Sequence, residues 1–454
     1  MRGTLLMPGD KDYDTARKVY NGMIDKRPAF IARCANVADV IEAVNFARGN
    51  QLVTAIRSGG HNGAGLGVCN DGLVIDLSGL KGIHIDPQAR TAWVEAGNTL
   101  GDIDHATHAF GLAIPSGIFS TTGVGGITLG GGLGHLTRHF GLAIDNLLEA
   151  NIILADGSFV KANDRENADL FWAIRGGGGN FGVVVSFLFR LQPVRTVYAG
   201  PMLWEMDEAA NVLKWYREYI RNAPDEVNGF FAFLTVPAVA PFPEHLHGKK
   251  MCGIVWCYSG DPDKAGPFLQ SIRSFREPAL DFVGPLPLPA LQSMFDGLYP
   301  PGYSWYWKGD YVNELTDEAI AIHLQYGAQL PTPLSTMHLY PINGAAARVG
   351  NKQTAWNYRS ATWAMVIAGV DPDPANDELI TAWARSYWQA LHPHSAGGSY
   401  INFMMEEGDD RIKATYGDNY PRLEAIKRKY DPANLFCVNQ NIKPGPLSAA
   451  SLLS

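Results

Sequence analysis

Eight of the eighteen residues from Gly117 to Gly134 are glycine. Such a stretch predicts neither a helix nor an ordinary strand, because glycine loses more conformational freedom than any other residue when a regular element forms. Glycine is needed where the backbone passes close to a ligand, since a Cβ would collide there. We therefore expect this segment to lie as a loop against a flat ligand.

Another glycine turn follows the apolar run Leu52–Ile56 and reads Arg57-Ser58-Gly59-Gly60-His61-Asn62-Gly63. Paired glycines tolerate positive φ, so successive backbone N–H groups can converge on one anion. Arg57 would add positive charge beside a bound phosphate, and His61 would point at whatever the phosphate carries. These seven residues alone fit an ordinary strand-to-loop turn with a surface histidine equally well.

A third cluster, Arg175–Gly182, precedes the apolar strand Val183–Val185. None of the three clusters has the strand, G-x-G-x-x-G, helix order of a dinucleotide fingerprint, so a Rossmann-type NAD site is disfavoured. The chain also lacks a G-x-x-x-x-G-K-[ST] phosphate loop. The clusters therefore indicate a ligand held in a different type of fold.

The three clusters, in this order, resemble the FAD-binding domain of the vanillyl-alcohol oxidase / para-cresol methylhydroxylase superfamily. The tail is similar to the C-terminal signature of the berberine-bridge-enzyme-like oxidoreductases, through Tyr416–Tyr420, Lys427–Phe436 and Asn439–Ile442. Within these, the chain resembles the bacterial branch that includes 6-hydroxy-D-nicotine oxidase. The resemblance extends from about Arg27 to Pro444.

The resemblance implies an FAD cofactor that is covalently bonded to His61. Many plant and fungal members attach the flavin a second time through a cysteine, but Phe119 and Ser120 occupy that place here, so a single attachment is expected. The residues expected to contact FAD are Arg57, Ser58, Gly59, Gly60, His61, Asn62, Gly65, Ser116, Gly117, Thr121, Thr122, Gly123, Gly125, Gly126, Thr128, Gly179, Gly182, Val183, Val184, Tyr400, Asn402, Asn439 and Asn441.

Two positions carry expectations about the reaction. The resemblance places Thr122 on the oxygen-facing side of the flavin, where small residues accompany oxidases and bulky ones accompany dehydrogenases. Asn146, in the segment Gly141–Asn146, is expected to meet the substrate or the flavin ring, whereas Asp145 fits a structural hydrogen-bond acceptor as well. A plain loop threonine remains the alternative for Thr122.

The proton-accepting residue is the least defined part of the expected site. Many relatives place tyrosines at two positions that hold Leu133 and Phe403 here, and the polar positions of another family strand hold Ala364 and Val366. Four polar residues remain near these segments: Lys308, Tyr358, Arg359 and Tyr400. For each of them a structural role is favoured over the role of the base. We expect Lys308 and Tyr400 to be the first of these to test, because a desolvated lysine can act as a neutral base.

These observations predict an FAD oxidase that takes hydride from a small organic substrate and produces hydrogen peroxide from oxygen. The alternatives are a dehydrogenase with another electron acceptor, and a lyase or binding protein that retains flavin without net redox turnover. The aromatic residues of the middle region weakly favour an aromatic or alkaloid-like substrate, because aromatics also fill cores. Without a tyrosine pair as base, amines or phenol-activated substrates are expected to react better than sugars.

The pattern of elements predicts an α+β protein. Residues 1–198 are expected to form the FAD-binding part, which is α/β with mixed sheets and has its core at about 27–195. Residues 199–399 are expected to form a substrate-binding part with a large antiparallel sheet flanked by helices. Residues 400–454 are expected to return to the FAD-binding part. Asn36 and Asn98 are expected to begin helices. Residues 282–301, rich in Pro and aromatics, are expected to be a loop. The active site is expected between the two parts.

Composition excludes several other classes. The net charge of −8 disfavours nucleic-acid binding, and no apolar run is as long as a membrane span. The N-terminus lacks signal-peptide features, and the five cysteines form no disulfide pattern, so the cytoplasm is the expected location. Cys252 and Cys257 fit a buried strand better than a metal pair, and no metal site is expected. The chain is expected to act as a monomer or homodimer.

Overall fold

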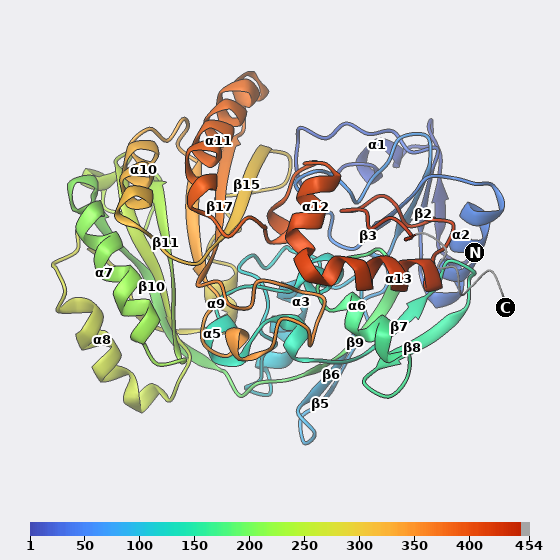
Figure 1. Cartoon of the computed structure of the whole chain (residues 1–454), viewed down its shortest axis with the longest axis horizontal. Coiled ribbons are helices and arrows are strands. Elements are labelled where there is room, and N and C mark those ends of the chain that lie inside the picture. Colours follow the sequence, from blue (N-terminus) through green and yellow to red (C-terminus); the bar gives the residue numbers. More distant parts are fainter. Residues whose placement is uncertain (446–454) are drawn as a thin grey trace.

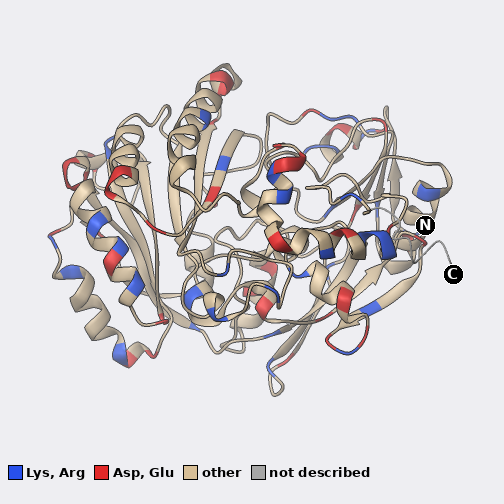
Figure 2. Cartoon of the chain, in the orientation of Figure 1, with Lys and Arg blue, Asp and Glu red and all other residues tan. Residues whose placement is uncertain are grey.

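The computed structural model describes residues 1–445, which form three β-sheets with helices packed against them (Figure 1). The predicted α+β fold is confirmed. Residues 446–454, the end of the predicted returning tail, lie outside the described residues. Basic and acidic residues are interspersed along the chain (Figure 2). No helix within residues 1–445 has the length and apolar character needed to cross a membrane.

The first sheet is mixed and has the order β1-β2-β4-β3. The strands β2, β4 and β3 run parallel, and β1 is antiparallel to β2. Helix α2 (Val37–Gly49) begins where predicted, because the Asn36 side chain accepts a hydrogen bond from the Asp39 N–H. The strands are β1 (Thr4–Leu6), β2 (Phe30–Arg33), β3 (Thr54–Arg57) and β4 (Leu73–Asp76).

The second sheet, with the order β5-β6-β9-β7-β8, is antiparallel throughout, so the predicted mixed sheet applies only to the first. Helix α3 (Leu100–His108) begins one residue later than predicted, because Thr99 and Asp102 form a capping box. The strands are β5 (Ile83–Asp86), β6 (Thr91–Glu95), β7 (Leu147–Ile153), β8 (Phe159–Asn163) and β9 (Val183–Arg190).

The glycine-rich segment contains a helix, contrary to the prediction from its composition. Helix α4 (Val124–Gly130) has Gly123 as its N-cap and buries Val124, Thr128 and Leu129. Tertiary packing of an apolar face stabilises helices whose intrinsic propensity is poor. The rest of the segment is irregular, with left-handed Gly131 and Gly132 directly after the helix.

The third sheet has eight strands, all paired antiparallel, in the order β13-β10-β12-β11-β16-β17-β15, with β14 beside β10. The predicted loop 282–301 contains β14 and helix α9 (Leu288–Gln292). The strands are β10 (Thr196–Glu205), β11 (Val227–Thr235), β12 (Lys250–Tyr258), β13 (Leu280–Asp281), β14 (Gly284–Pro287), β15 (Ser304–Val312), β16 (Thr336–Pro341) and β17 (Trp363–Asp371).

Four helices cover one face of this large sheet. Their buried residues form one apolar cluster with one side of the sheet, and Figure 1 shows them on its outer side. The opposite face packs against the end of the second glycine cluster and the segment after it, including Leu133 and Leu142, and against the short helix α9. The covering helices are α7 (Ala209–Asn222), α8 (Ala265–Arg273), α10 (Asp317–Gly327) and α11 (Asp377–Leu391).

The tail packs back onto the first part of the chain through α12 (Asp409–Tyr416) and α13 (Tyr420–Tyr430), with α13 lying against α6 (Ala168–Ile174) (Figure 1). Lys427 is fully buried and pairs with Asp431 at 2.6 Å. Its ammonium also donates to the carbonyl of Asn180 in the third glycine cluster, at 2.7 Å. The predicted division of the chain into residues 1–198, 199–399 and 400–454 requires the tail to contact the first part. The division itself stays a prediction.

The buried ring of His135 links stability to pH. It is 3% exposed, and burial lowers its pKa to about 3. The unfolded chain binds a proton at this residue near pH 6.5, whereas the folded chain does not, so its contribution to stability is lost as the pH falls from 6.5 toward 3. We expect His135→Leu to make the free energy of unfolding fall less steeply between pH 7 and 4, as measured by urea denaturation. His84, which is exposed on β5, provides the control His84→Leu; equal slopes in wild type and His135→Leu would contradict this expectation.

Candidate functional site

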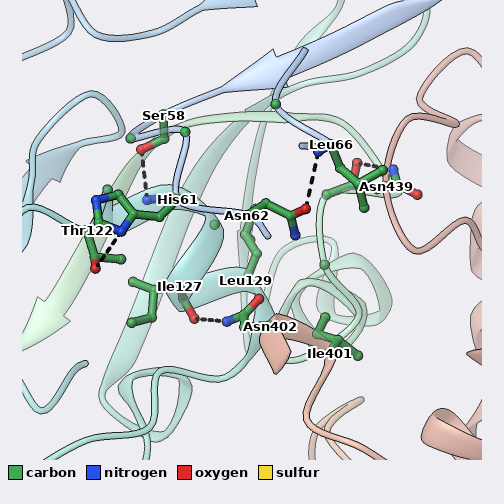
Figure 3. Close-up of a pocket in the computed structure, with 18 of the residues that line it drawn as sticks. Ser58, His61, Asn62, Leu66, Thr122, Ile127, Leu129, Ile401, Asn402 and Asn439 are labelled. Atoms are coloured by element: carbon green, nitrogen blue, oxygen red, sulfur yellow. Dashed lines mark hydrogen bonds between the residues drawn. The ribbon is translucent and has the colours of Figure 1, made fainter. Parts of the chain in front are cut away.

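One large cavity lies between the three glycine clusters, the tail and the inner face of the eight-stranded sheet, opposite the four covering helices. Its two halves differ in character. Backbone of the glycine clusters forms one half, while aromatic side chains from β15, β16 and the preceding loops form the other. Figure 3 shows Ser58, His61, Thr122, Asn402 and Asn439 around this cavity.

The first two glycine clusters touch backbone to backbone. A Cβ placed on Gly59 would lie 2.3 Å from the amide nitrogen of Gly123, and one on Gly123 would lie 2.1 Å from that of Gly59. Between them, Ser58 Oγ donates to the Ala96 carbonyl at 2.6 Å and accepts from the Gly125 N–H at 3.2 Å (Figure 3). This contact fixes the two clusters relative to each other.

Two glycines face the cavity without any packing reason to be glycine. A Cβ on Gly126 or Gly179 would meet no protein atom within 4 Å, and neither residue has the positive φ that favours glycine. Both line the cavity. A ligand that approaches the backbone closely is the remaining physical reason for lacking a Cβ there.

Several buried polar atoms at or beside the cavity have no hydrogen-bond partner within residues 1–445. They include the side-chain oxygens of Asn439, which lines the cavity, and of Ser116, Thr128 and Asn441, which are next to lining residues in sequence; all four are predicted from the sequence to contact FAD. Buried polar groups in folded proteins are normally paired, so these oxygens call for a polar ligand or ordered water. The glycine half of the cavity therefore fits a group with a flat ring and a polar chain.

His61 is held at the junction of the two halves. Its ring stacks on Tyr20 with centroids 4.0 Å apart, and its Nδ1 lies 3.5 Å from Thr122 Oγ1 (Figure 3). Burial lowers the pKa of His61 to about 4, and a hydrogen bond with the Thr121 backbone opposes this more weakly. The imidazole is therefore neutral at pH 7 and retains a nitrogen lone pair.

The segment before β2 connects the His61 turn to the large sheet. Asn21 Nδ2 donates to the carbonyls of Gly63, at 2.7 Å, and Trp305, at 2.9 Å. Asn21 Oδ1 accepts from the Trp305 N–H at 3.0 Å. The neighbouring Tyr20 hydroxyl donates to the Tyr299 carbonyl. The position of the His61 ring thus depends on β15 and the loop before it.

The charge of Arg57 is already compensated, contrary to its predicted role beside a phosphate. Its guanidinium donates to Asp76 at 2.7 Å, and both side chains are buried. The parallel pairing of β3 and β4 places these two residues opposite each other. Arg57 lines the cavity but serves mainly to fix the end of β3.

Most of the predicted FAD-contacting residues line the cavity. The exceptions lie beside it: Gly65, Ser116, Thr121, Thr128, Val183 and Asn441. Val183 illustrates the reason, since neighbouring strand residues face opposite sides and Val184 lines the cavity instead. Gly65 packs against Ile24, where a Cβ would approach within 2.6 Å of the side chain.

The predicted catalytic residues divide into two groups. Thr122 and Tyr400 line the cavity, but Asn146 and Lys308 do not. Asn146 is saturated by hydrogen bonds to the Phe140 and Leu142 carbonyls and from Gln192. Lys308 pairs with Glu407 at 2.9 Å. Its neighbour Trp307 faces the cavity, so strand alternation turns Lys308 away.

Tyr400 is held by donors rather than poised as a free base. Its hydroxyl oxygen accepts from the Gly132 N–H at 3.0 Å and from Asn402 Nδ2 at 2.8 Å. Burial raises its pKa. The other two candidates are structural, because Arg359 forms a bidentate pair with Asp145 and the Tyr358 hydroxyl donates to the Ala414 carbonyl.

Sequence analysis missed the aromatic half of the cavity. Three strands contribute alternate residues to this side of the cavity: β15 through Trp305 and Trp307, β16 through Thr336, His338 and Tyr340, and β17 through Val366 and Ala368. Leu133 and Phe403, which replace the expected tyrosines, also line it. The period-two spacing in these strands was the signal that marks one shared face.

Comparison with known proteins agrees with this geometry. The FAD binding domain family model matches residues 28–163, and the berberine and berberine-like model matches residues 399–443. An FAD-linked oxidoreductase of Dictyostelium discoideum is 32% identical, over 98% of this chain and 95% of the relative. The chain therefore belongs to the FAD-linked oxidoreductases of the berberine-bridge-like group, and it is an enzyme that uses FAD.

Particular members of the group can be compared over their full length. The (R)-6-hydroxynicotine oxidase of Paenarthrobacter nicotinovorans is 30% identical, over 98% of this chain and 97% of the relative. The crystal structure of 6-hydroxy-D-nicotine oxidase from Arthrobacter nicotinovorans superimposes with a TM-score of 0.87 at 26% identity, covering 98% of both chains. The chain thus spans nearly the whole length of both proteins.

The two cavity-facing glycines provide a test of the FAD site. We expect Gly126→Ala and Gly179→Ala to fold normally but to bind FAD about tenfold more weakly, because the new methyl group occupies the ligand's space. Gly266, which is exposed on α8 and also has no neighbour within 4 Å, provides the control Gly266→Ala. All variants are made in a His61→Ala background, so that no covalent bond traps the cofactor. Circular dichroism measures folding, and the ratio of flavin to protein absorbance after dialysis measures FAD content. FAD content equal to that of His61→Ala alone in both cavity variants would contradict the assignment.

Proposed function

We propose that the enzyme is an oxidase whose FAD is covalently bonded to His61 alone, and that it oxidises a small organic substrate with oxygen to give hydrogen peroxide. The observation that carries this proposal is the neutral His61 ring, held beside Thr122 at the edge of a glycine-lined cavity. Bound FAD supplies the hydride acceptor and the electron carrier. The chain supplies binding, orientation and exclusion of water.

A single attachment is supported by what surrounds His61. Phe119 lines the cavity, and the Ser120 hydroxyl is hydrogen-bonded to Asp296, so neither position offers a thiol. All five cysteines lie within the described residues, and none of them lines the cavity. A neutral imidazole has the free lone pair that bond formation requires, and Tyr20 shields its other face from water.

The remaining cavity residues have assignable roles in this proposal. Asn402 and Asn439 bring side-chain amides from the tail to the glycine half, where Asn402 donates to the Ile127 carbonyl and Asn439 to that of Gly179 (Figure 3). Thr122 presents a small side chain on the same side as His61. We propose that it leaves the path by which oxygen reaches the cofactor.

No carboxylate or lysine side chain lines the cavity within residues 1–445. A substrate that needs a strong base to lose its proton is therefore poorly served, since a positioned base typically contributes about 10²–10⁴-fold. We propose an aromatic substrate that needs no strong base, such as a phenol, which loses its proton readily, or an amine that has already lost its proton to solvent. The aromatic half of the cavity supports the same class.

The attachment can be tested directly. In wild type we expect the yellow colour to remain with the protein after acid denaturation, whereas His61→Ala should release all of it. The variant should also oxidise substrate more slowly, because a covalent bond to the ring is lost. Absorbance of the protein and small-molecule fractions measures the outcome. Flavin that leaves wild-type protein completely would overturn the covalent bond while leaving FAD binding intact.

The oxygen path can be tested at Thr122. We expect Thr122→Ile to slow reoxidation of the reduced enzyme in air by about tenfold or more, because added carbon narrows the path, while anaerobic reduction changes little. Stopped-flow absorbance follows both half-reactions. The isosteric Thr122→Val variant is the control, since it removes the hydroxyl and keeps the size. Slow reoxidation of wild type itself would instead identify a dehydrogenase with another electron acceptor.

A further inference from the structure

The aromatic half of the cavity contains one hydrogen-bonded polar pair. On β16, His338 Nδ1 and the Tyr340 hydroxyl oxygen lie 2.6 Å apart. Both residues line the cavity, as does Thr336 on the same strand face. The Thr336 hydroxyl is already used, because it donates to the Phe233 carbonyl at 2.7 Å. The pair is therefore the main polar feature that this strand presents to a ligand.

The neighbouring strand leaves space in front of the pair. Val366 on β17 lies opposite His338, and Ala368 lies opposite Thr336. Both of these small side chains line the cavity. The His338 ring is partly exposed there, while Tyr340 is 6% exposed. Phe230 and Phe403 pack against the Tyr340 ring at centroid distances of 4.9 and 5.7 Å.

Both members of the pair are neutral at pH 7. Burial lowers the pKa of His338 to about 3, and burial raises the pKa of Tyr340. The Nδ1 atom of His338 is engaged by Tyr340, whereas Nε2 takes part in no hydrogen bond within residues 1–445. Because the tyrosine can either donate to Nδ1 or accept from it, Nε2 can serve a ligand as donor or acceptor.

The charges around the cavity restrict its ligand further. Arg57 is the one charged side chain among the described lining residues, and Asp76 neutralises it. The aromatic half has no charged lining residue within residues 1–445, so a charged substrate would lack a counter-ion there and is strongly disfavoured. A sugar is disfavoured for a related reason, since many hydroxyls would be buried against few partners. Trp305 and Trp307 provide flat apolar surface instead.

We propose that His338 and Tyr340 form the substrate-recognition pair of this site, and that they select an uncharged aromatic molecule whose hydroxyl group hydrogen-bonds to His338 Nε2. Tyr340 is a positioning residue, because it holds the imidazole in one orientation. Binding of such a molecule by the pair does not require the proposed oxidase function. Only the conclusion that the bound molecule is the substrate rests on that function.

The experiment compares two neutral ligands of similar shape on the holoenzyme. Phenol carries the hydroxyl, and toluene replaces it by a methyl group. Phenol has no sp3 carbon to give up hydride, so its binding does not require turnover. Perturbation of the flavin absorbance spectrum gives both dissociation constants. We expect phenol to bind about tenfold more tightly than toluene in wild type, as one hydrogen bond predicts.

The variants locate this preference. We expect His338→Phe to abolish it and His338→Gln, whose amide can still hydrogen-bond, to retain part of it. Tyr340→Phe should reduce the preference several-fold, since the imidazole loses its anchor. The chain offers a matched control in His323 and Tyr387, which form the same 2.6 Å contact in the helical layer. Tyr387→Phe should leave the preference unchanged.

Three results would overturn the proposal: equal affinities of phenol and toluene in wild type, a preserved preference in His338→Phe, or tighter binding of benzylammonium or benzoate than of phenol. His338→Gln keeps the test decisive if the phenylalanine variant fails to fold. Failure of the oxidase function has a different signature. It would appear as released flavin or slow reoxidation while the phenol preference remained.

Discussion

The backbone contact between Gly59 and Gly123 is the constraint on which the site depends. No side chain fits between the two backbone segments, because a Cβ on either glycine would lie within 2.3 Å of the other residue's amide nitrogen. This contact brings the end of β3 to the start of α4. It thereby places His61 beside Thr122. The glycines of both clusters present backbone, without side chains, to the cavity.

The same cavity requires parts of the chain that are far apart in sequence. Lys427 donates to the carbonyls of Asn180 and Phe436, and the first of these bonds spans 247 residues. A buried lysine is costly unless its charge and all its donors are used, and here Asp431 supplies the counter-charge. This arrangement anchors the tail, which carries Asn402 and Asn439, against the third glycine cluster.

The glycine half of the site could be predicted from the sequence, because glycine turns, a histidine and tail asparagines are local signals. The orientation of side chains on the large sheet could not. All nine residues of β17 are buried, so alternation does not reveal which face the helices cover. The same ambiguity made Lys308 a candidate instead of Trp307, one residue earlier. On β16 the alternation of Thr336, His338 and Tyr340 with Met337 and Leu339 marks one shared face, but it does not show that this face lines the cavity.

Composition also misled in one instance. Local propensity argues against a helix at Val124–Gly130, yet burial of Val124 and Leu129 stabilises one. Asn36 shows the opposite case, since its capping hydrogen bond needs only the residues next to it. Local interactions were thus predictable from the sequence, whereas those decided by distant packing were not.

The Asn21 bridge has a consequence for how the enzyme matures. Asn21 joins the His61 turn to Trp305, a residue 284 positions further along the chain. The ring of His61 consequently reaches its final environment only after β15 has been synthesised and has entered the large sheet. Bonding of the cofactor to His61, as proposed, is then a late event that follows folding of nearly the whole chain. A ribosome-bound fragment ending before β15 would lack the environment that prepares the histidine.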